Sequence, residues 1–185
     1  AVEPDMRKIA KIMNFGVLYG LSPYGISQQT GLTPQQGQKF IEAYFGSYPK
    51  ITEYLEYTKS QAKTNGFVET LLGRRRYIPE INSANFQIRS SGERMAVNMP
   101  IQGTSADIIK ISMINLQETL NTLGLQTQML IQVHDELILE SPIHEVDQVC
   151  SILNETMPSA VKLSVPLDIE IKTGVNWNDM KPILG

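Results

Sequence analysis

The sequence contains a single cysteine, Cys150, among its 185 residues. One cysteine excludes an internal disulfide and a zinc site built on several thiolates. It is consistent with a reducing, cytoplasmic setting. No run of 18 apolar residues is present, so we expect no membrane-spanning segment and no membrane partner. The amino-terminal stretch also lacks the charged-then-apolar order of a secretory signal.

The composition is that of a folded domain or of one lobe of a larger protein. Hydrophobic residues make up 42% of the chain and charged residues 19%. This balance supplies a hydrophobic core and argues against extensive disorder. Because the chain begins with Ala1 rather than Met, we expect it to be a piece of a longer protein.

Charge is unevenly distributed along the chain, although the net charge is only -3. Residues 1–110 carry 13 Lys and Arg against 9 Asp and Glu, a balance of +4. Residues 111–185 carry 3 against 10, a balance of -7. The asymmetry suggests a basic surface for a polyanion together with an acidic site that could hold metal. The alternative is two solvated surfaces that happen to differ.

Proline and glycine punctuation, together with changes of hydrophobic period, predicts a mostly helical α+β lobe packed with a small antiparallel sheet. Pro100 is expected to interrupt the helical pattern in the middle of the chain. The expected helices cover residues 4–20, 33–46, 50–66, 85–98, 104–123 and 143–157. Thr33 and Gln36 should form a capping box at the start of the second helix, and Gly66 should end the third. The expected strands cover residues 67–71, 75–78, 127–133, 136–139 and 165–171.

Cations and aromatic residues recur every four positions in the first helix, as Arg7, Lys11, Phe15 and Tyr19. On a helix this spacing places them on one continuous stripe, cationic at its start and aromatic at its end. A nucleoside triphosphate has the same polarity, with phosphates followed by a sugar and a flat base. The neighbouring Gly16 indicates that something approaches the backbone closely. The alternative is a core aromatic pair with solvated cations beside it.

An acidic segment, His134-Asp135-Glu136, separates the apolar runs 129–131 and 137–139. The runs predict paired strands with this segment at the turn. Two adjacent carboxylates repel each other, and a bound Mg²⁺ would satisfy them because it prefers hard oxygen ligands. The alternative is an exposed turn with ordinary surface acids.

A basic turn, Arg74-Arg75-Arg76, follows Gly73 and suits contact with a phosphate backbone. Side chains with donors for phosphates or base edges recur downstream in steps of four, at Arg94, Asn98 and Gln102. Minor-groove acceptors can be gripped by such donors without distinguishing one base pair from its reverse. The alternative is a solvent-facing basic turn beside an ordinary helix surface.

These blocks occur together and in one order, and in them the sequence resembles the carboxy-terminal polymerase region of bacterial family A DNA polymerases, the DNA polymerase I type. RKIAKIMNFGVLYG at residues 7–20 is similar to the motif B helix of the fingers. QVHDEL at 132–137 is similar to motif C of the palm. LGRRRY at 72–77 and ERMAVNMPIQG at 93–103 match two further blocks. The resemblance implies fingers helices in residues 1–66 and a palm portion in residues 67–185.

The resemblance also implies a role for each matched residue at the incoming deoxynucleoside triphosphate. Arg7 and Lys11 would hold its phosphates, and Lys11 would assist catalysis. Phe15 would pack on the sugar and base. Tyr19 would lie at the template base, where Gly20 would let the template backbone pass closely.

Other matched residues would contact primer-template DNA or metal. Asp135 would bind catalytic Mg²⁺, with Glu136 beside it in a supporting role. The implied reaction is DNA-templated addition of deoxynucleotides to a primer 3′ end with two Mg²⁺ ions, in replication and repair. The residues expected at DNA, including the basic turn, are Arg74, Arg75, Arg76, Arg94, Asn98, Gln102 and His134.

The family's second essential carboxylate comes from motif A, upstream of motif B. Only Glu3 and Asp5 precede Arg7 as acidic residues, and neither fits that motif. We therefore expect the chain to need a missing amino-terminal part of the polymerase and to be inactive alone. The implied reaction also requires Asp135 and Lys11 to converge on one triphosphate-and-magnesium pocket.

Two other classes of function stay open at this stage. One is a non-enzymatic DNA-binding or scaffold lobe, marked by salt-dependent DNA affinity without nucleotide incorporation. The other is a metal phosphohydrolase built on His134 and Asp135, which would need several further ligands. His144 is the only other histidine, and its position beside Glu145 suggests a solvated surface residue.

Overall fold

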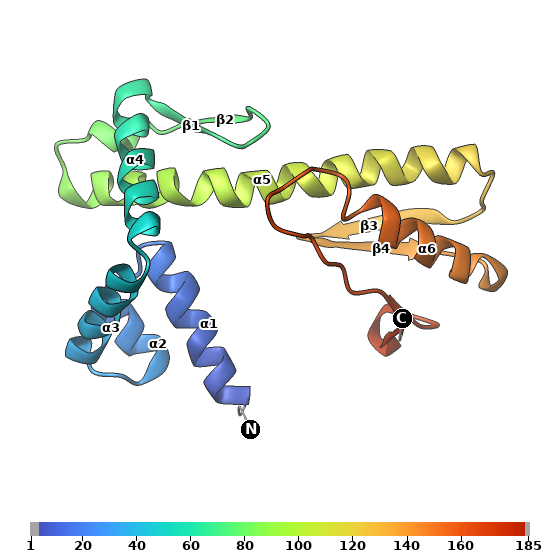
Figure 1. Ribbon diagram of the computed structural model, residues 1–185, viewed down its shortest axis with the longest axis horizontal. Coiled ribbons are helices and arrows are strands. Elements are labelled where there is room, and N and C mark those ends of the chain that lie inside the picture. Colours follow the sequence, from blue (N-terminus) through green and yellow to red (C-terminus); the bar gives the residue numbers. More distant parts are fainter. Residues whose placement is uncertain (1–3, 184–185) are drawn as a thin grey trace. The chain divides into compact units, whose positions relative to one another are not determined.

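The computed structural model describes residues 4–183, which fall into two compact units with their boundary between residues 103 and 104. Helices and small two-stranded antiparallel sheets make up the chain, so the predicted α+β class is confirmed (Figure 1). Glu3, which the sequence analysis considered, lies outside the described residues. Within residues 4–183, no helix is both long and apolar enough to cross a membrane.

The first unit begins with four helices, each of which starts at a proline. Pro lacks a backbone N–H and has a fixed φ, which suits the first helical turn. Thr33 and Gln36 form the expected capping box, with Thr33 N donating to Gln36 Oε1 at 2.8 Å and Gln36 N donating to Thr33 Oγ1 at 3.2 Å. The helices are α1 (Pro4–Leu18), α2 (Pro23–Thr30), α3 (Pro34–Ser47) and α4 (Pro49–Asn65).

Helix α2 was not predicted, although the sequence carried its start signal. The Ser22 hydroxyl caps it by accepting a hydrogen bond from Gly25 N at 3.1 Å, and Pro23 opens its first turn. A Ser-Pro pair before a short helix is a recognised start signal. The helix is only eight residues long, which left little hydrophobic periodicity to detect.

A short antiparallel hairpin follows α4, as predicted. Strand β1 (Phe67–Glu69) pairs with β2 (Arg75–Tyr77), and a 3-10 turn, η1 (Pro79–Asn82), comes next. Val68 lies in the hydrophobic core of this unit. The buried members of that core are Ala62, Val68, Ile78, Ile81, Ala96 and Met99.

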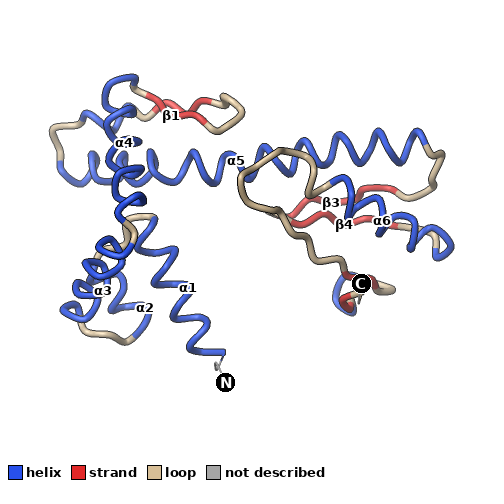
Figure 2. Tube along the Cα trace, viewed as in Figure 1, coloured by secondary structure: helices blue, strands red, loops and turns tan. Residues whose placement is uncertain are grey.

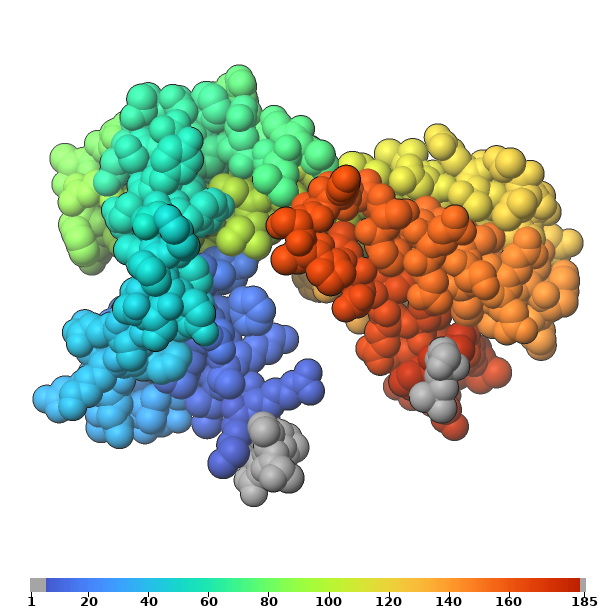
Figure 3. Space-filling view, viewed as in Figure 1, coloured from blue at the N-terminus to red at the C-terminus, as the bar shows by residue number. Residues whose placement is uncertain are grey.

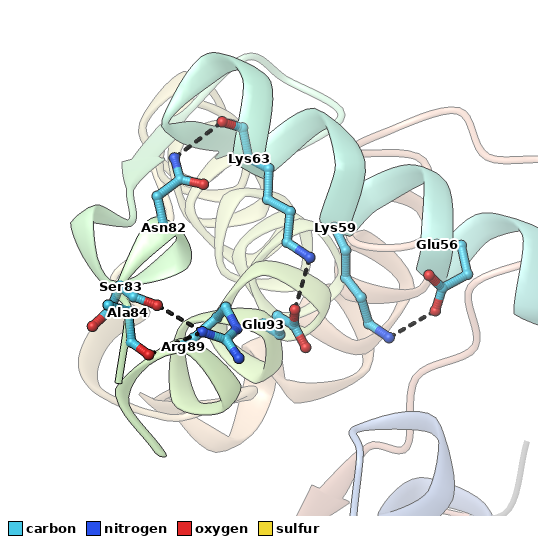
Figure 4. A network of polar contacts seen from close by, with 8 residues as sticks. All are labelled: Glu56, Lys59, Lys63, Asn82, Ser83, Ala84, Arg89 and Glu93. Carbon is cyan, nitrogen blue, oxygen red and sulfur yellow. Dashed lines mark hydrogen bonds and ion pairs between the residues drawn. The ribbon is translucent and has the colours of Figure 1, made fainter. Parts of the chain in front are cut away.

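Polar contacts join α4 to the segment that leads into the next helix (Figure 4). Lys63 Nζ lies 2.9 Å from Glu93 Oε1, and the Lys63 carbonyl accepts a hydrogen bond from Asn82 Nδ2 at 3.2 Å. Arg89 Nη1 donates to the Ser83 carbonyl at 2.8 Å. The hydrogen bond from Lys63 lowers the pKa of Glu93, so this carboxylate stays ionised as the partner of the lysine.

The long helix α5 (Phe86–Thr122) runs without a break through Pro100, so the predicted interruption was wrong. Proline removes one backbone hydrogen bond and strains the preceding turn, which in isolation favours a break. Here the adjacent turn is held by burial, since Ala96, Val97 and Met99 are at most 9% exposed. Packing therefore overrides the local preference at this position.

The second unit is coloured from yellow to red in Figure 3. It is built around a second hydrophobic core. Strand β3 (Gln128–Val133) pairs with β4 (Glu136–Glu140) in an antiparallel hairpin with an irregularity between Met129 and Ile131. The 3-10 turn η2 (Ile143–Glu145) leads into α6 (Val146–Thr156). The core residues are Leu116, Leu120, Val149, Ile152 and Leu153, against which Met129, Leu137 and Leu139 pack.

The predicted strand over residues 165–171 is wrong, because this segment is loop (Figure 2). Pro166 has no N–H to give to a strand ladder. Ile169 and Ile171 instead pack against the second core, which accounts for the alternating apolar pattern. The strands of the tail are shorter and later: β5 (Lys172–Thr173) pairs with β6 (Lys181–Pro182), and η3 (Trp177–Asp179) lies between them.

Glu145 is a buried carboxylate that fastens the start of β3 to the turn before α6. Its oxygens accept hydrogen bonds from Gln126 N at 2.9 Å, Thr127 N at 3.0 Å and Thr127 Oγ1 at 2.7 Å. The hydrogen bond from the Gln126 backbone is the largest of the causes that hold the pKa of Glu145 below its ordinary value. The ionised form is therefore part of the folded structure.

We expect Glu145→Gln to lower the free energy of unfolding at pH 7. A carboxylate whose pKa is lowered by folding stabilises the protein above its unfolded pKa of about 4.3, and this contribution is lost as pH falls through the folded value. Denaturant unfolding between pH 3 and pH 7 should thus show a weaker acid dependence for the variant. The control is Glu155→Gln on the exposed side of α6; equal effects of the two changes would contradict this account.

Candidate functional site

The predicted stripe on α1 is at the surface. Arg7, Lys11 and Phe15 are exposed, and Phe15 keeps 51% of its accessible area. The Phe15 and Tyr19 rings lie nearly parallel, at 12°, with centroids 6.4 Å apart. A core role for this pair would require both rings to be buried. The exposed Phe15 ring therefore favours a surface for a ligand over the core alternative.

A cavity of about 600 Å³ lies beside the carboxyl-terminal half of this stripe. Lys11, Phe15, Tyr19 and Gly20 line it, together with Arg94 of α5. Gly20 has a φ of 81°, and a Cβ there would lie 3.3 Å from Arg94 Cγ. The structure thus brings the α1 stripe and the first of the three α5 donors together in one place. Sequence reasoning did not single out Ser22 and Gln29, which also line the cavity.

Leu21 packs closely against the α1 backbone at Gly16. A Cβ on Gly16 would lie 2.7 Å from Leu21 Cδ2, and one on Gly25 of α2 would lie 2.6 Å from Leu21 Cδ1. The close approach expected at Gly16 is therefore made by the chain's own Leu21. This side chain sets how closely α1 and α2 pack beside the cavity.

The donors on α5 lie along one helix, because Pro100 does not break it. Residues 94, 98 and 102 follow an i, i+4 series and drift slowly around the helix. Arg94 and Gln102 are exposed, whereas Asn98 is half-buried. Asn98 Oδ1 is buried without a hydrogen-bond partner in the described part of the chain. Such an oxygen is costly unless a donor reaches it, which marks Asn98 as a candidate contact.

The three arginines of the basic turn differ in their surroundings. Arg75 Nε lies 2.6 Å from Glu69 Oε1 across the hairpin. Arg76 Nη2 lies 3.3 Å from Met95 Sδ. Met95 is three residues before Asn98 on α5, so Arg76 approaches the helix near the donor series. Arg74 is exposed at the turn.

In the second unit, His134 and Asp135 form the two-residue turn between β3 and β4, as predicted. His134 has a φ of 53°, the only positive φ of a non-glycine residue in the described chain. Gln132 Nε2 donates to the His134 carbonyl at 3.0 Å and holds the turn. Left-handed backbone costs a non-glycine residue about 1 kcal/mol or more, and such strain concentrates at functional sites.

Asp135 and Glu136 are both exposed, so solvent screens their repulsion and the fold itself does not need a cation between them. They line a cavity of about 600 Å³ within the second unit, together with Asp168 and Glu170. The last two were missed, although they alternate in the apolar segment around Ile169.

Accessible carboxylate oxygens are the ligands that Mg²⁺ prefers, so Asp135 and Glu136 fit part of a magnesium site. Within residues 4–183, no group of three or more His, Cys, Asp or Glu side chains is arranged to hold a metal ion. His144 is exposed and lies 3.9 Å from Glu145, away from the turn. This arrangement does not favour the phosphohydrolase alternative, which needs several histidine or acidic ligands.

The charge asymmetry follows the two units. Residues 1–103 carry 12 Lys and Arg against 8 Asp and Glu, and residues 104–185 carry 4 against 11. The balances are again +4 and -7. The basic unit therefore holds the candidate phosphate contacts, and the acidic unit holds the candidate metal ligands.

We expect His134→Gly to leave the free energy of unfolding unchanged or to raise it by up to about 1 kcal/mol, because glycine adopts a positive φ without a steric cost. The control, His144→Gly, removes a side chain where φ needs no glycine, and should destabilise the chain by about 0.5 kcal/mol. Denaturant unfolding measures both variants. A clear loss of stability for His134→Gly would show that the side chain supports the fold.

The chain matches the model of the DNA polymerase family A over residues 1–179. It is 48% identical over 180 residues to DNA polymerase I of Bacillus caldotenax, covering 97% of this chain and 20% of that protein. DNA polymerase I of Deinococcus radiodurans is 46% identical over 180 residues, with 97% and 19% covered. The chain thus spans about a fifth of the length of these relatives.

A solved structure described as the POL domain of Pol1 from M. smegmatis in complex with DNA primer-template and dNTP is similar to this chain with a TM-score of 0.86. The two share 41% identity, and the match covers 90% of this chain and 30% of that one. The family model spans nearly all of the sequence, and the four sequence blocks lie on the elements described above. The chain therefore belongs to DNA polymerase family A.

Proposed function

We propose that the chain supplies the carboxy-terminal fingers and palm part of a DNA-directed DNA polymerase that acts in replication and repair. The observation that carries the proposal is the cavity in which Lys11, Phe15, Tyr19, Gly20 and Arg94 come together. Family membership and the similarity to a polymerase domain in complex with primer-template DNA and dNTP support it. Cys150 has no cysteine partner, which agrees with a cytoplasmic setting.

The α1 stripe binds the incoming deoxynucleoside triphosphate in this proposal. Arg7 lies in the first turn of α1, where the helix dipole adds to its positive charge, and Lys11 follows one turn later on the same stripe. Their exposed side chains are free to pair with phosphate oxygens. Phe15 packs on the sugar and base, and Tyr19 and Gly20 meet the template base at the end of the helix.

Primer-template DNA is held by the basic hairpin, by the donor series on α5 and by His134. The basic turn of residues 74–76 presents positive charge to the phosphate backbone. Arg94, Asn98 and Gln102 reach phosphates or base edges, and the unsatisfied Asn98 Oδ1 accepts a hydrogen bond there. Contacts of this kind grip any sequence, as templated synthesis requires.

In the reaction, the primer 3′ oxygen attacks the α-phosphate of the bound nucleotide in line with the bond that breaks, and pyrophosphate leaves. Asp135, with Glu136 beside it, holds Mg²⁺, which when bound stabilises negative charge on the reacting phosphate. Lys11 neutralises charge on the triphosphate, and the aromatic residues hold the base and sugar in position. Closure of α1 only around a fitting base pair would couple binding energy to selection.

Two parts of this proposal concern the whole polymerase. Lys11 and Asp135 belong to different units, so their convergence on one nucleotide stays a prediction. The assignment of residues 1–66 to fingers and 67–185 to palm is likewise a prediction. The boundary between the two compact units falls elsewhere in the chain, between residues 103 and 104. An amino-terminal part of the polymerase is the expected partner, because the curated relatives are about five times as long.

In the full-length polymerase, we expect Lys11→Ala to weaken nucleotide use at least about tenfold, because a charge-assisted hydrogen bond contributes about 1.5–3 kcal/mol. The free energy of unfolding should change by less than about 0.5 kcal/mol, because Lys11 is exposed. Single-nucleotide incorporation at varied nucleotide concentration measures the first quantity, and denaturant unfolding measures the second.

Lys39→Ala is the matched control, since Lys39 is an exposed lysine on α3 that does not line the cavity beside α1. It should leave nucleotide use near that of the unchanged protein. Equal losses for Lys39→Ala and Lys11→Ala would indicate a general charge effect. A large stability loss with unchanged nucleotide affinity for Lys11→Ala would favour a structural role.

A polypeptide of these 185 residues should bind DNA in a salt-dependent manner yet fail to extend a primer with Mg²⁺ and all four deoxynucleotides. The reason is that Asp135 and Glu136 alone do not supply the carboxylates for two metal ions. A primer-extension assay decides this point. Robust extension would show that the second carboxylate is not required from elsewhere.

A further inference from the structure

The β1–β2 hairpin has two faces with different surroundings. Cross-strand partners share a face, so the pair Val68 and Arg76 lies on one side of the hairpin. Val68 is 5% exposed and belongs to the core of the first unit, so this side faces the core. The pairs at residues 67 and 77 and at residues 69 and 75 lie on the opposite side.

Arg75 contacts both a carboxylate and an aromatic ring on this outer side. Its Nε donates to Glu69 Oε1 at 2.6 Å, and its Cζ lies 4.5 Å from the centroid of the Phe67 ring. The Phe67 ring in turn contacts Tyr77 edge to face, with centroids 5.6 Å apart at 62°. The hydrogen bond that Arg75 donates to Glu69 is the largest cause of the raised pKa of Arg75. One carboxylate and one aromatic face thus hold this guanidinium beside its own hairpin.

Arg76 is in a different situation on the core-facing side. Its Nη2 contacts Met95 Sδ at 3.3 Å, and a thioether sulfur is only a weak acceptor. Arg76 has no carboxylate partner in the part of the chain described. Its charge is therefore available to a phosphate, and Met95 orients it beside the α5 donors.

We propose that Arg75 is a positioning residue: its pairing with Glu69 and Phe67 shapes the hairpin, while Arg76 carries the phosphate contact. This inference rests on the proposed function and refines it. A phosphate approaching Arg75 would also approach the Glu69 carboxylate, and the repulsion offsets the attraction. The Glu69–Arg75 pair carries no net charge. Placing it next to DNA therefore neutralises no phosphate and releases no counterions.

The salt dependence of DNA binding separates the two roles. Each phosphate contact adds about 0.9 to the slope of log affinity against log salt concentration. We expect Arg76→Gln in the complete chain to lower this slope by about 0.9 on a DNA duplex. Arg75→Gln should leave the slope unchanged and lower affinity only about two- to threefold, as expected for loss of an exposed ion pair.

Glu69→Gln supplies the second test of the same idea. If Arg75 acts through Glu69, then Glu69→Gln should lower DNA affinity by the same factor as Arg75→Gln, and the double variant should lose no more than either. If Arg75 instead binds phosphate, Glu69→Gln should raise affinity by removing a nearby negative charge. Circular dichroism confirms that each variant is folded.

The outcomes distinguish this inference from the function on which it rests. A slope reduced by Arg75→Gln, or raised affinity for Glu69→Gln, would overturn the positioning role while leaving DNA binding intact. An unchanged slope for Arg76→Gln would overturn the assignment of the phosphate contact. Loss of salt-dependent binding by the unchanged chain would overturn the proposed function itself, and the inference with it.

Discussion

The left-handed backbone of Gly20 is the constraint on which the cavity beside α1 depends. With a φ of 81°, it ends the α1 region and lets the chain turn into α2 close to Arg94. A side chain at this position would be strained and would press on the Arg94 stem. Leu21, seated between Gly16 and Gly25, then fixes how α1 and α2 pack. The cavity lined by Lys11, Phe15 and Tyr19 lies beside this turn between α1 and α2 and depends on it.

The acidic unit also depends on a residue with left-handed backbone, His134 in the tight β3–β4 turn. His134 accepts an unfavourable φ so that Asp135 and Glu136 stand at the end of the β3–β4 hairpin. Met129 of β3 and Leu137 and Leu139 of β4 pack on the second core, which anchors the hairpin. Strain in the turn is thereby offset by packing elsewhere, as is common where a functional side chain has to be displayed.

Local chemistry made much of the fold predictable. The Thr33 capping box, the left-handed Gly66 and the two hairpins lie where the sequence placed them. These features depend on a few adjacent residues, so the sequence alone contains the information. The helix break predicted at Pro100 was wrong because burial of its neighbours outweighs the tendency of proline to interrupt a helix. The strand predicted over residues 165–171 was wrong because the alternating apolar residues there pack against the second core and do not pair with a neighbouring strand.

The candidate site was predictable in parts for the same reason. Residues on one helix, such as Lys11 and Phe15, share a face by periodicity alone. The juxtaposition of Gly20 with Arg94 joins residues far apart in the chain, and no local pattern encodes it. Burial of Asn98 Oδ1 and the pairing of Arg75 with Glu69 likewise depend on tertiary packing and strand register. Charge composition, by contrast, already separated the basic unit from the acidic one.

In the proposed function, the Asp135 carboxylate at the β3–β4 turn serves the chemistry of nucleotidyl transfer and is not needed for the fold. The most direct measurement is the single-turnover rate of nucleotide incorporation by a full-length polymerase carrying Asp135→Asn, with Asp147→Asn on α6 as the exposed control. Loss of several kcal/mol of metal-assisted stabilisation should slow Asp135→Asn at least about a hundredfold, with DNA affinity and stability retained. The control should react at the unchanged rate. An unchanged rate for Asp135→Asn, or equal losses in the two variants, would contradict the account.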